Sequence, residues 1–502
     1  MSEKRNRLWQ GLFFLLIFAF LFIWFSKIHA LVVFDADDWS YLAYVRKTTP
    51  VWGEWNPAKV FPEVIFPFNS TIAAWVLAPI TRDYITAQTL MHAFVGSLSI
   101  TMYLWCFFCL LRRCFPVSRL SASLVTALFL LFHFLALRSR ESGNQYLFYC
   151  VDLNCYYNYL LPCLLNASLV MCLTKNEKLS RFLTEGAPAA KGCFYVVVYF
   201  AIFSNLPASG ILAAYAGSVV LLDLIRRWKG RCWKRFLPEN AFPIGVLAAW
   251  MISAVFELSG GRAASAGTDA SLFYQVYLTC KYLAGILLEC NRLFQISVLV
   301  IAVGFFVCLF RDRKKRPMDP ALGSLLLTAV IACAAYGGYL VLLCAVGGPG
   351  TIQRSENLFG LFFLGTLIVL LMLAHLVSRY PKLLLVFPLL LVFLLSGIDT
   401  REPTFLDSNF GKLRPEVCAA ISRDLIQQMQ EADEAGLSEV VLRLPAYVAD
   451  PETQDNWPHS LVLMERLPGT LYSHGLISRN IRVIPVADTA KNEQFHLPIP
   501  TK

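Results

Sequence analysis

The sequence predicts a mainly α-helical, polytopic membrane protein with a small soluble α/β module at its C-terminal end. The chain has 502 residues, of which 57% are hydrophobic and only 16% are charged, and its mean hydropathy is +0.56. This composition is far more apolar than that of an ordinary soluble protein. Apolar stretches of about 20 residues, enough to cross a hydrocarbon layer of ~30 Å, recur along most of the chain. We therefore divide it into a membrane domain, 1–399, and a more polar tail, 400–502.

Eleven apolar segments are expected to cross the bilayer. The fifth is short, and Asn205-Leu206-Pro207 separates it from the sixth. These two segments therefore either cross fully or form a re-entrant pair, and both arrangements return the chain to the same side. The eleven segments are 8–33, 85–111, 120–137, 157–173, 193–204, 208–225, 241–257, 292–310, 321–346, 358–377 and 383–397.

The distribution of Lys and Arg predicts the orientation, because short basic loops face the cytoplasm. Alternate connections carry the basic residues, at 4–7, 112–119, 175–191, 226–235, 311–316 and 379–382. The N-terminus is therefore expected on the cytoplasmic side of the inner membrane, and the odd number of spans places the tail in the extracytoplasmic or periplasmic space. The net charge of +10 then reflects topology and contact with anionic membrane lipid, and it does not indicate a nucleic-acid partner.

The first external loop, 34–84, is too long for a simple connector. It begins with an acidic cluster, Asp35, Asp37 and Asp38, followed by Trp39 and Tyr41. Aromatic residues in short amphipathic stretches are typical of helices that lie in the membrane interface. We interpret the loop as a floor on which a lipid-linked headgroup and a polar acceptor meet.

The tail is expected to alternate helices and strands. Helices are predicted at 414–435 and 461–474, and strands at 440–444 and 481–484. Such a module has enough apolar residues for a small core packed against the membrane domain. Its role is either acceptor recognition or stabilisation.

Three motifs and the overall topology resemble a known family. The motifs are the 37–41 sequence Asp-Asp-Trp-Ser-Tyr after the first span, Asn-Tyr-Leu-Leu-Pro at 158–162, and Gly-Gly-Arg-Ala at 260–263. Together they resemble the GT-C superfamily of polytopic glycosyltransferases that use polyprenyl-phosphate sugars. Within it, they look most like the bacterial glucosyltransferase-like proteins that decorate O-antigen, the glycan of lipopolysaccharide, or other surface glycans.

The resemblance implies an enzyme that moves a hexose, such as glucose, from a polyprenyl-phosphate donor to a surface-glycan acceptor. The transfer would be inverting and would take place at the outer face of the membrane. A flippase and a donor synthase would then be partners in the same pathway.

The chemistry of this transfer needs a base that takes the acceptor proton, which a carboxylate supplies. Asp37 or Asp38 is the expected base, and the other would orient it, bind sugar hydroxyls or hold a divalent cation such as Mg²⁺ or Mn²⁺. The leaving phosphate needs cations, and guanidinium binds phosphate in a bidentate manner. The candidate phosphate-binding residues are Arg262 and Arg354, which we favour, with Arg46, Lys59 and Arg138.

A sugar or acceptor pocket is expected from the polar and aromatic residues of the first two external loops. Stacking and hydrogen bonding to a sugar are one role for these side chains, and an aromatic belt at the membrane interface is the other. The candidates are Trp39, Tyr41, Glu63, Glu141, Tyr157 and Asn158.

Two other classes of membrane protein share these features. A flippase or transporter of lipid-linked sugars would place ionisable groups or broken helices at mid-membrane, whereas most spans here are nearly free of charge. A surface-polysaccharide polymerase or ligase also acts on polyprenyl-linked glycans. The position of the acidic cluster in the first loop favours the glycosyltransferase over both, and a non-enzymatic scaffold would leave the cluster unexplained.

Overall fold

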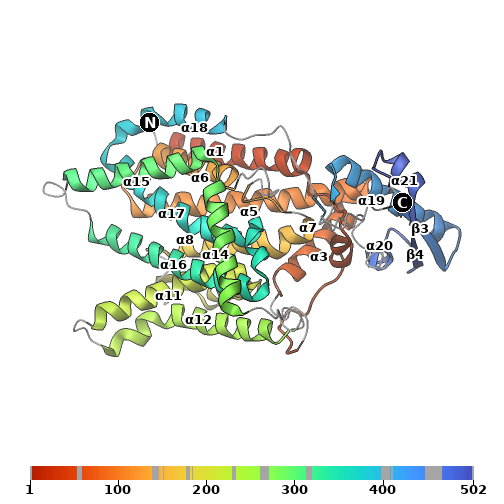
Figure 1. The fold of residues 1–502 in the computed structure, drawn as a ribbon, viewed down its shortest axis with the longest axis horizontal. Helices are drawn as coiled ribbons and strands as arrows, with labels where there is room; N and C mark the ends of the chain where they lie inside the picture. Colours follow the sequence, from red (N-terminus) through yellow and green to blue (C-terminus); the bar gives the residue numbers. More distant parts are fainter. Residues whose placement is uncertain are drawn as a thin grey trace.

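The computed structural model describes residues 3–53, 59–137, 146–150, 152–176, 181–183, 185–228, 233–260, 271–312, 319–396, 407–408, 411–446 and 466–499. Figure 1 shows most long helices running side by side, with the tail elements gathered at one end of the bundle. We call this end the tail-facing end. The chain is therefore mainly α-helical, as its composition predicts.

Nine of the described helical segments are long and apolar enough to cross a membrane. These segments are Asn6–Ile28, Pro62–Thr81, Tyr84–Cys114, Leu153–Leu173, Leu206–Trp228, Trp233–Leu258, Arg292–Asp312, Pro320–Gly347 and Ser355–Arg379. Two further apolar helices, α6 (Arg119–Leu135) and α10 (Pro188–Ile202), are shorter. The protein is thus a multi-pass membrane protein by these criteria, while the predicted count of eleven is not confirmed.

The first half of the membrane domain contains several helices with local changes of pitch. The elements are α1 (Glu3–Ile23), η1 (Trp24–Ile28), α2 (Ala36–Tyr41), α3 (Pro62–Ile72), η2 (Ala73–Leu77), α4 (Ala78–Thr81), α5 (Tyr84–Cys114), α6, α7 (Leu153–Cys155), η3 (Tyr156–Leu160), α8 (Leu161–Leu173), α10, α11 (Leu206–Trp228), η4 (Trp233–Arg235) and α12 (Phe236–Leu258).

The second half contains α14 (Leu272–Glu289), α15 (Arg292–Asp312), α16 (Pro320–Gly347), η5 (Pro349–Gln353), α17 (Ser355–Arg379), η6 (Pro381–Leu385) and α18 (Phe387–Leu395). Helix α14 was not predicted, and Figure 1 shows it at a steep angle to the long helices. The predicted last span, 383–397, is here divided between η6 and the nine-residue helix α18.

The predicted first external loop contains a long helical run, Pro62–Thr81, formed by α3, η2 and α4. At one end of this run Glu63 forms an ion pair with Arg46. Just beyond the other end, Asp83 forms an ion pair with Arg423 of the tail. Near the start of the run, the Phe66 ring stacks on the Tyr157 ring of η3.

The tail is built around a parallel pair of strands. Strands β3 (Glu439–Pro445) and β4 (Arg482–Asp488) pair from Glu439↔Arg482 to Pro445↔Asp488. Helix α19 (Pro415–Glu434) precedes β3, and the short helix α20 (Leu467–Ser473) lies between β3 and β4 in sequence. Helix α21 (Thr489–Gln494) follows β4. A separate two-residue antiparallel pair joins β1 (Asp407–Ser408) to β2 (Gly411–Lys412). The order of these elements agrees with the predicted helices and strands, although 461–465 lie outside the described residues.

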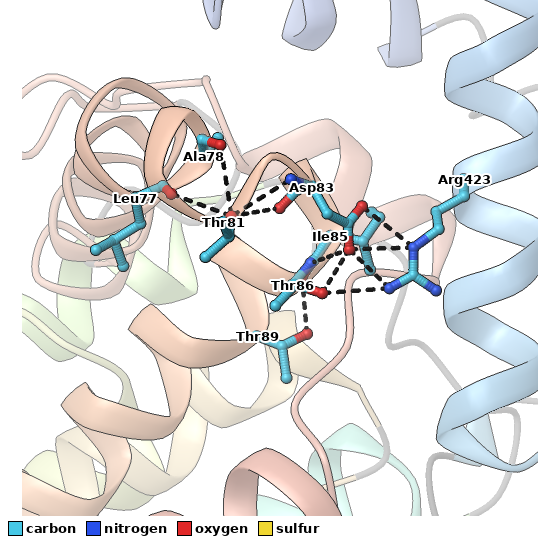
Figure 2. A network of polar contacts seen from close by, with 8 residues as sticks. All are labelled: Leu77, Ala78, Thr81, Asp83, Ile85, Thr86, Thr89 and Arg423. Atoms are coloured by element: carbon cyan, nitrogen blue, oxygen red, sulfur yellow. Dashed lines mark hydrogen bonds and ion pairs between the residues drawn. The ribbon is translucent and has the colours of Figure 1, made fainter.

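Polar contacts attach the tail to the connection that follows α1. Figure 2 shows Arg423 of α19 reaching Asp83, which also caps the N-terminus of α5 by accepting from the Thr86 N–H at 3.0 Å. The Ser422 hydroxyl donates to the Val33 carbonyl at 2.7 Å, and the Thr470 hydroxyl donates to the Trp39 carbonyl at 2.7 Å. The tail and the connection after α1 therefore lie at the same end of the bundle.

Candidate functional site

The acidic cluster forms the start of α2. The Asp35 carboxylate accepts from the Asp37 N–H at 2.9 Å, while Asp38 Oδ2 accepts from the Asp35 N–H at 3.2 Å. These reciprocal bonds are a capping box, in which two side chains satisfy backbone donors that the first helical turn leaves unpaired. The sequence thus folds into a short helix directly after α1, and both Asp35 and Asp38 are buried.

Asp38 also joins α2 to a second segment. Its Oδ2 accepts from the Phe34 N–H at 3.1 Å as well, and its Oδ1 accepts from the Asn154 N–H at 2.7 Å. The side chain is fully buried. Because both carboxylate oxygens are bound to backbone donors, Asp38 positions α2 against α7 and offers no open oxygen to a substrate.

Asp37 is only partly buried. Within the described part of the chain, its carboxylate has no hydrogen bond or ion pair. Of the two carboxylates expected to act as base, Asp37 is therefore the accessible one.

A third buried carboxylate, Asp152, lies near Asp38. It caps α7 by accepting from the Cys155 N–H at 2.5 Å. Burial raises the pKa of Asp38 well above its usual range, and the carboxyl groups of Asp152 and Asp35 raise it further. Burial, with Asp35 as the next cause, also raises the pKa of Asp152 to about 7. The group around Asp38 therefore holds protons at a higher pH than exposed carboxylates do.

Two cations meet at Tyr159, which lies in η3, a few residues beyond the Asp38 contact. The Lys59 Nζ lies 5.5 Å from the centroid of the Tyr159 ring, and the Arg354 guanidinium carbon lies 5.2 Å from it. Such positions are stabilised by the electron-rich ring face. Arg354 Nη2 also lies 3.4 Å from the Cys155 sulfur. Two of the predicted phosphate-binding residues, almost 300 residues apart in sequence, thus both contact Tyr159.

Buried carboxylates hold two of the cations in place. Arg354 Nε donates to Glu356 Oε1 at 2.6 Å, and Arg46 forms an ion pair with Glu63. Both glutamates are only 2–3% exposed. Lys59 is 8% exposed and has no ion pair among the described residues. The Glu63 carboxylate therefore lies near two cations, Arg46 in an ion pair and Lys59 within electrostatic reach.

Tyr41 connects the acidic and basic parts of the site. Burial raises the pKa of Tyr41 to about 12, the carboxylates of Glu63 and Asp37 raise it further, and Arg46 lowers it. Tyr41 is therefore within electrostatic reach of both Asp37 and the Arg46–Glu63 pair. We call Asp37, Tyr41, Arg46, Lys59, Glu63, Tyr159 and Arg354 the outer cluster.

Three residues predicted to line the sugar or acceptor pocket are buried. The Trp39 ring is fully buried, at 6.5 Å from the Tyr84 ring. The Tyr157 ring stacks on Phe66 at 4.5 Å. The Asn158 amide, also buried, donates to the Asn154 carbonyl at 3.0 Å. In this structure these side chains pack the protein interior.

Three other predicted residues, Arg262, Arg138 and Glu141, lie outside the described residues. The structure adds Asp152, Tyr159 and Glu356 to the neighbourhood of the site. Sequence signals for two of them exist: Asp152 directly precedes a helix as an N-cap residue, and Glu356 follows Arg354 at the start of an apolar span.

Asp38 is a poor ligand for a divalent cation. Mg²⁺ needs several open oxygen ligands in near-octahedral geometry, but the oxygens of Asp38 are bound to backbone N–H groups. In the described part of the chain, no three His, Cys, Asp or Glu residues form a metal-binding group.

Neither a family model, nor a curated protein, nor a solved structure matches this chain. Function is therefore inferred from the geometry of the outer cluster.

Proposed function

We propose that the protein is an integral-membrane glycosyltransferase that moves a hexose from a polyprenyl-phosphate donor to a surface-glycan acceptor, with Asp37 as the general base. The observation that carries this proposal is the accessible carboxylate of Asp37 in the same cluster as Lys59, Arg46 and Arg354. An acid and several cations at a membrane-facing connection suit a reaction between a hydroxyl group and a lipid phosphate.

In the proposed reaction, the acceptor hydroxyl oxygen attacks the anomeric carbon of the sugar. The bond from this carbon to the phosphate oxygen breaks, and the phosphate leaves with the bonding electrons. The acceptor proton moves to the Asp37 carboxylate. Attack on the face opposite the leaving group inverts the anomeric configuration. Asp38 keeps α2, and with it Asp37, in position through its bond to the Asn154 N–H.

The phosphate would be bound by Lys59 and Arg354. Cations strengthen their interaction with the leaving phosphate as its negative charge develops. Glu356 fixes one edge of the Arg354 guanidinium, while Lys59 has no competing ion pair among the described residues. Arg262 and Arg138 remain further candidates for this role.

A groove between α10 and α12 supports a lipid-linked donor. Its volume is about 580 Å³, and its lining is mostly apolar, with Tyr199, Phe203 and Phe242 among its residues. Where Phe203 lines the groove, its carbonyl accepts a hydrogen bond from the Phe61 N–H at 3.1 Å. Phe61 is two residues from Lys59, so a polyprenyl chain in this groove would carry its phosphate toward the outer cluster.

The proposal includes the architecture expected from the resemblance to the GT-C superfamily. The protein would have about eleven spans in the inner membrane, a cytoplasmic N-terminus and an extracytoplasmic tail. The acceptor would be lipopolysaccharide O-antigen or another surface glycan. The contact of the tail with α2 through Thr470 and Trp39 supports a role of the tail at the acceptor side.

The test uses the purified full chain in lipid nanodiscs, with radiolabelled polyprenyl-phosphate hexose and a crude surface-glycan fraction. We expect label to move to the glycan with inversion at the anomeric carbon. Label that stays on the lipid, combined with turnover of an oligosaccharide-diphosphate lipid, would replace the proposal with a polymerase or ligase. Movement of intact lipid-linked sugar across the bilayer without transfer would replace it with a flippase.

A further inference from the structure

A basic cavity lies at the end of the bundle away from the tail. It has a volume of about 1080 Å³ and opens between the ends of α1, α5, α6, α8 and α16. Arg112, Arg113, Arg119 and Lys175 line it, and Phe108 and Leu173 contribute apolar wall. The cavity is separate from the outer cluster, and the proposed function does not use it.

The four cations face no acidic residue within the lining. All charged side chains of the described lining are basic. Asp319, which lies two residues before the lining residue Ala321, accepts from the Ala321 N–H at 2.9 Å and so caps α16. Like charges that converge on a cavity repel one another unless an anion compensates them. The arrangement therefore fits an anionic ligand.

The side chains are held in place by neutral groups. Arg113 donates to the carbonyls of Cys172 and Thr174 at 3.0 and 2.8 Å, at the end of α8. Arg119 donates to Gln10 Oε1 at 3.0 Å, and Arg112 donates to the Val117 carbonyl. A guanidinium carries five N–H donors, so Arg112 and Arg119 keep donors for a ligand. The Lys175 ammonium has no partner among the described residues.

We propose that this cavity binds the phosphate headgroup of an anionic phospholipid from the membrane leaflet at that end. Phosphate is the shared chemistry of a lipid headgroup and a soluble phosphate, and two observations favour the lipid. Four of the five helices around the cavity, α1, α5, α8 and α16, belong to segments long and apolar enough to span a membrane. The apolar side chains of Phe108 and Leu173 also suit the glycerol backbone and the acyl carbons next to the headgroup. Basic pockets between transmembrane helices bind anionic headgroups in this way.

The experiment measures lipid retention by native mass spectrometry of the purified full chain. The chain is incubated in neutral detergent with equal amounts of phosphatidylglycerol and phosphatidylcholine. The pocket variant is Arg119→Gln with Lys175→Gln, which leaves the α8 cap by Arg113 intact. The matched control is Arg311→Gln with Lys382→Gln. It removes the same charge from two exposed positions, Arg311 in the last turn of α15 and Lys382 in η6, which follows α17.

We expect the wild type and the control to retain phosphatidylglycerol selectively. The pocket variant should lose roughly ten-fold or more of this retention, because each basic residue near an anionic surface contributes about five-fold. A pocket variant that binds like the wild type, or a control that loses as much, would overturn the proposal.

A competition experiment with the wild type adds soluble glycerol phosphate in millimolar excess. Displacement of the lipid by this compound would overturn the lipid assignment in favour of a soluble phosphate, whereas continued retention supports it.

Discussion

Asp37 and Asp38 are adjacent in sequence, but α2 turns their carboxylates to different surroundings. Asp38 faces inward and accepts from the N–H groups of Phe34, Asp35 and Asn154. Asp37 remains partly exposed. The sequence predicts that one of the pair is the base, but the choice depends on a contact between residues 116 positions apart, which no local pattern reveals.

The role assigned to Asp38 predicts a loss of stability in Asp38→Asn. An amide offers one acceptor oxygen instead of two, so its NH₂ group would face a backbone N–H donor. Leaving such a buried donor unpaired costs about 1–3 kcal/mol. Thermal unfolding in detergent should therefore shift to lower temperature. The control is Glu434→Gln on the exposed face of α19, which should unfold like the wild type. An unchanged midpoint for Asp38→Asn would show that Asp38 does not position α2.

At the scale of elements, eight of the nine candidate spans of the described residues lie at predicted segments, because apolar length is a local property. The other candidate, Pro62–Thr81, falls within the predicted first external loop. Helix α14 escaped prediction because polar residues such as Gln275, Thr279 and Lys281 interrupt its apolar surface. The meeting of Lys59 and Arg354 over Tyr159 could not be predicted, since it depends on how α7 and η3 pack between two distant connections. The tail elements follow the predicted order because their apolar periodicity is strong.

The junction of α2 and α7 predicts a pH dependence of stability. The pKa of Asp152 is about 7 in the folded protein, because of burial and then Asp35, and about 3.9 in the unfolded chain. The folded state therefore binds the proton more tightly. This contribution to stability is complete below pH ~4 and is lost as the pH rises through about 7.

Asp152→Asn isolates this effect, because asparagine also serves as an N-cap but does not ionise. We expect the difference in unfolding temperature between Asp152→Asn and the wild type to shift in favour of the variant between pH 5 and pH 8. The comparison is needed because His474, whose pKa burial lowers to about 4, gives the wild type the opposite slope. Parallel pH profiles for the two proteins would contradict a raised pKa at Asp152.

At the scale of the whole molecule, the tail and the connection after α1 form one layer at one end of the bundle (Figure 1). The basic cavity lies at the other end. The contacts of Arg423 with Asp83 and of Thr470 with Trp39 hold the tail in this layer. The two ends therefore differ in chemistry, because the outer cluster combines acids with cations, whereas all charged side chains of the described cavity lining are basic.

This arrangement predicts a labelling pattern in intact cells. Cysteine introduced at the exposed positions Trp52 and Glu434 should react with a membrane-impermeant maleimide, because both are expected outside. Cysteine at Lys382 should react only after the membrane is opened. Labelling is read by peptide mass, since the chain has 15 native cysteines. Opposite patterns for Trp52→Cys and Glu434→Cys would contradict the shared side, and external labelling of Lys382→Cys would contradict the orientation.

The most direct test of the central claim is the transfer rate of Asp37→Asn with labelled polyprenyl-phosphate hexose and the surface-glycan fraction. Glu434→Gln serves as the matched carboxylate-to-amide control. General-base catalysis contributes about 10²- to 10⁴-fold, so Asp37→Asn should lose at least about a hundred-fold in kcat and unfold at the wild-type temperature, while Glu434→Gln keeps the wild-type rate. A folded Asp37→Asn protein that transfers sugar at the wild-type rate would contradict the assignment of Asp37 as the base.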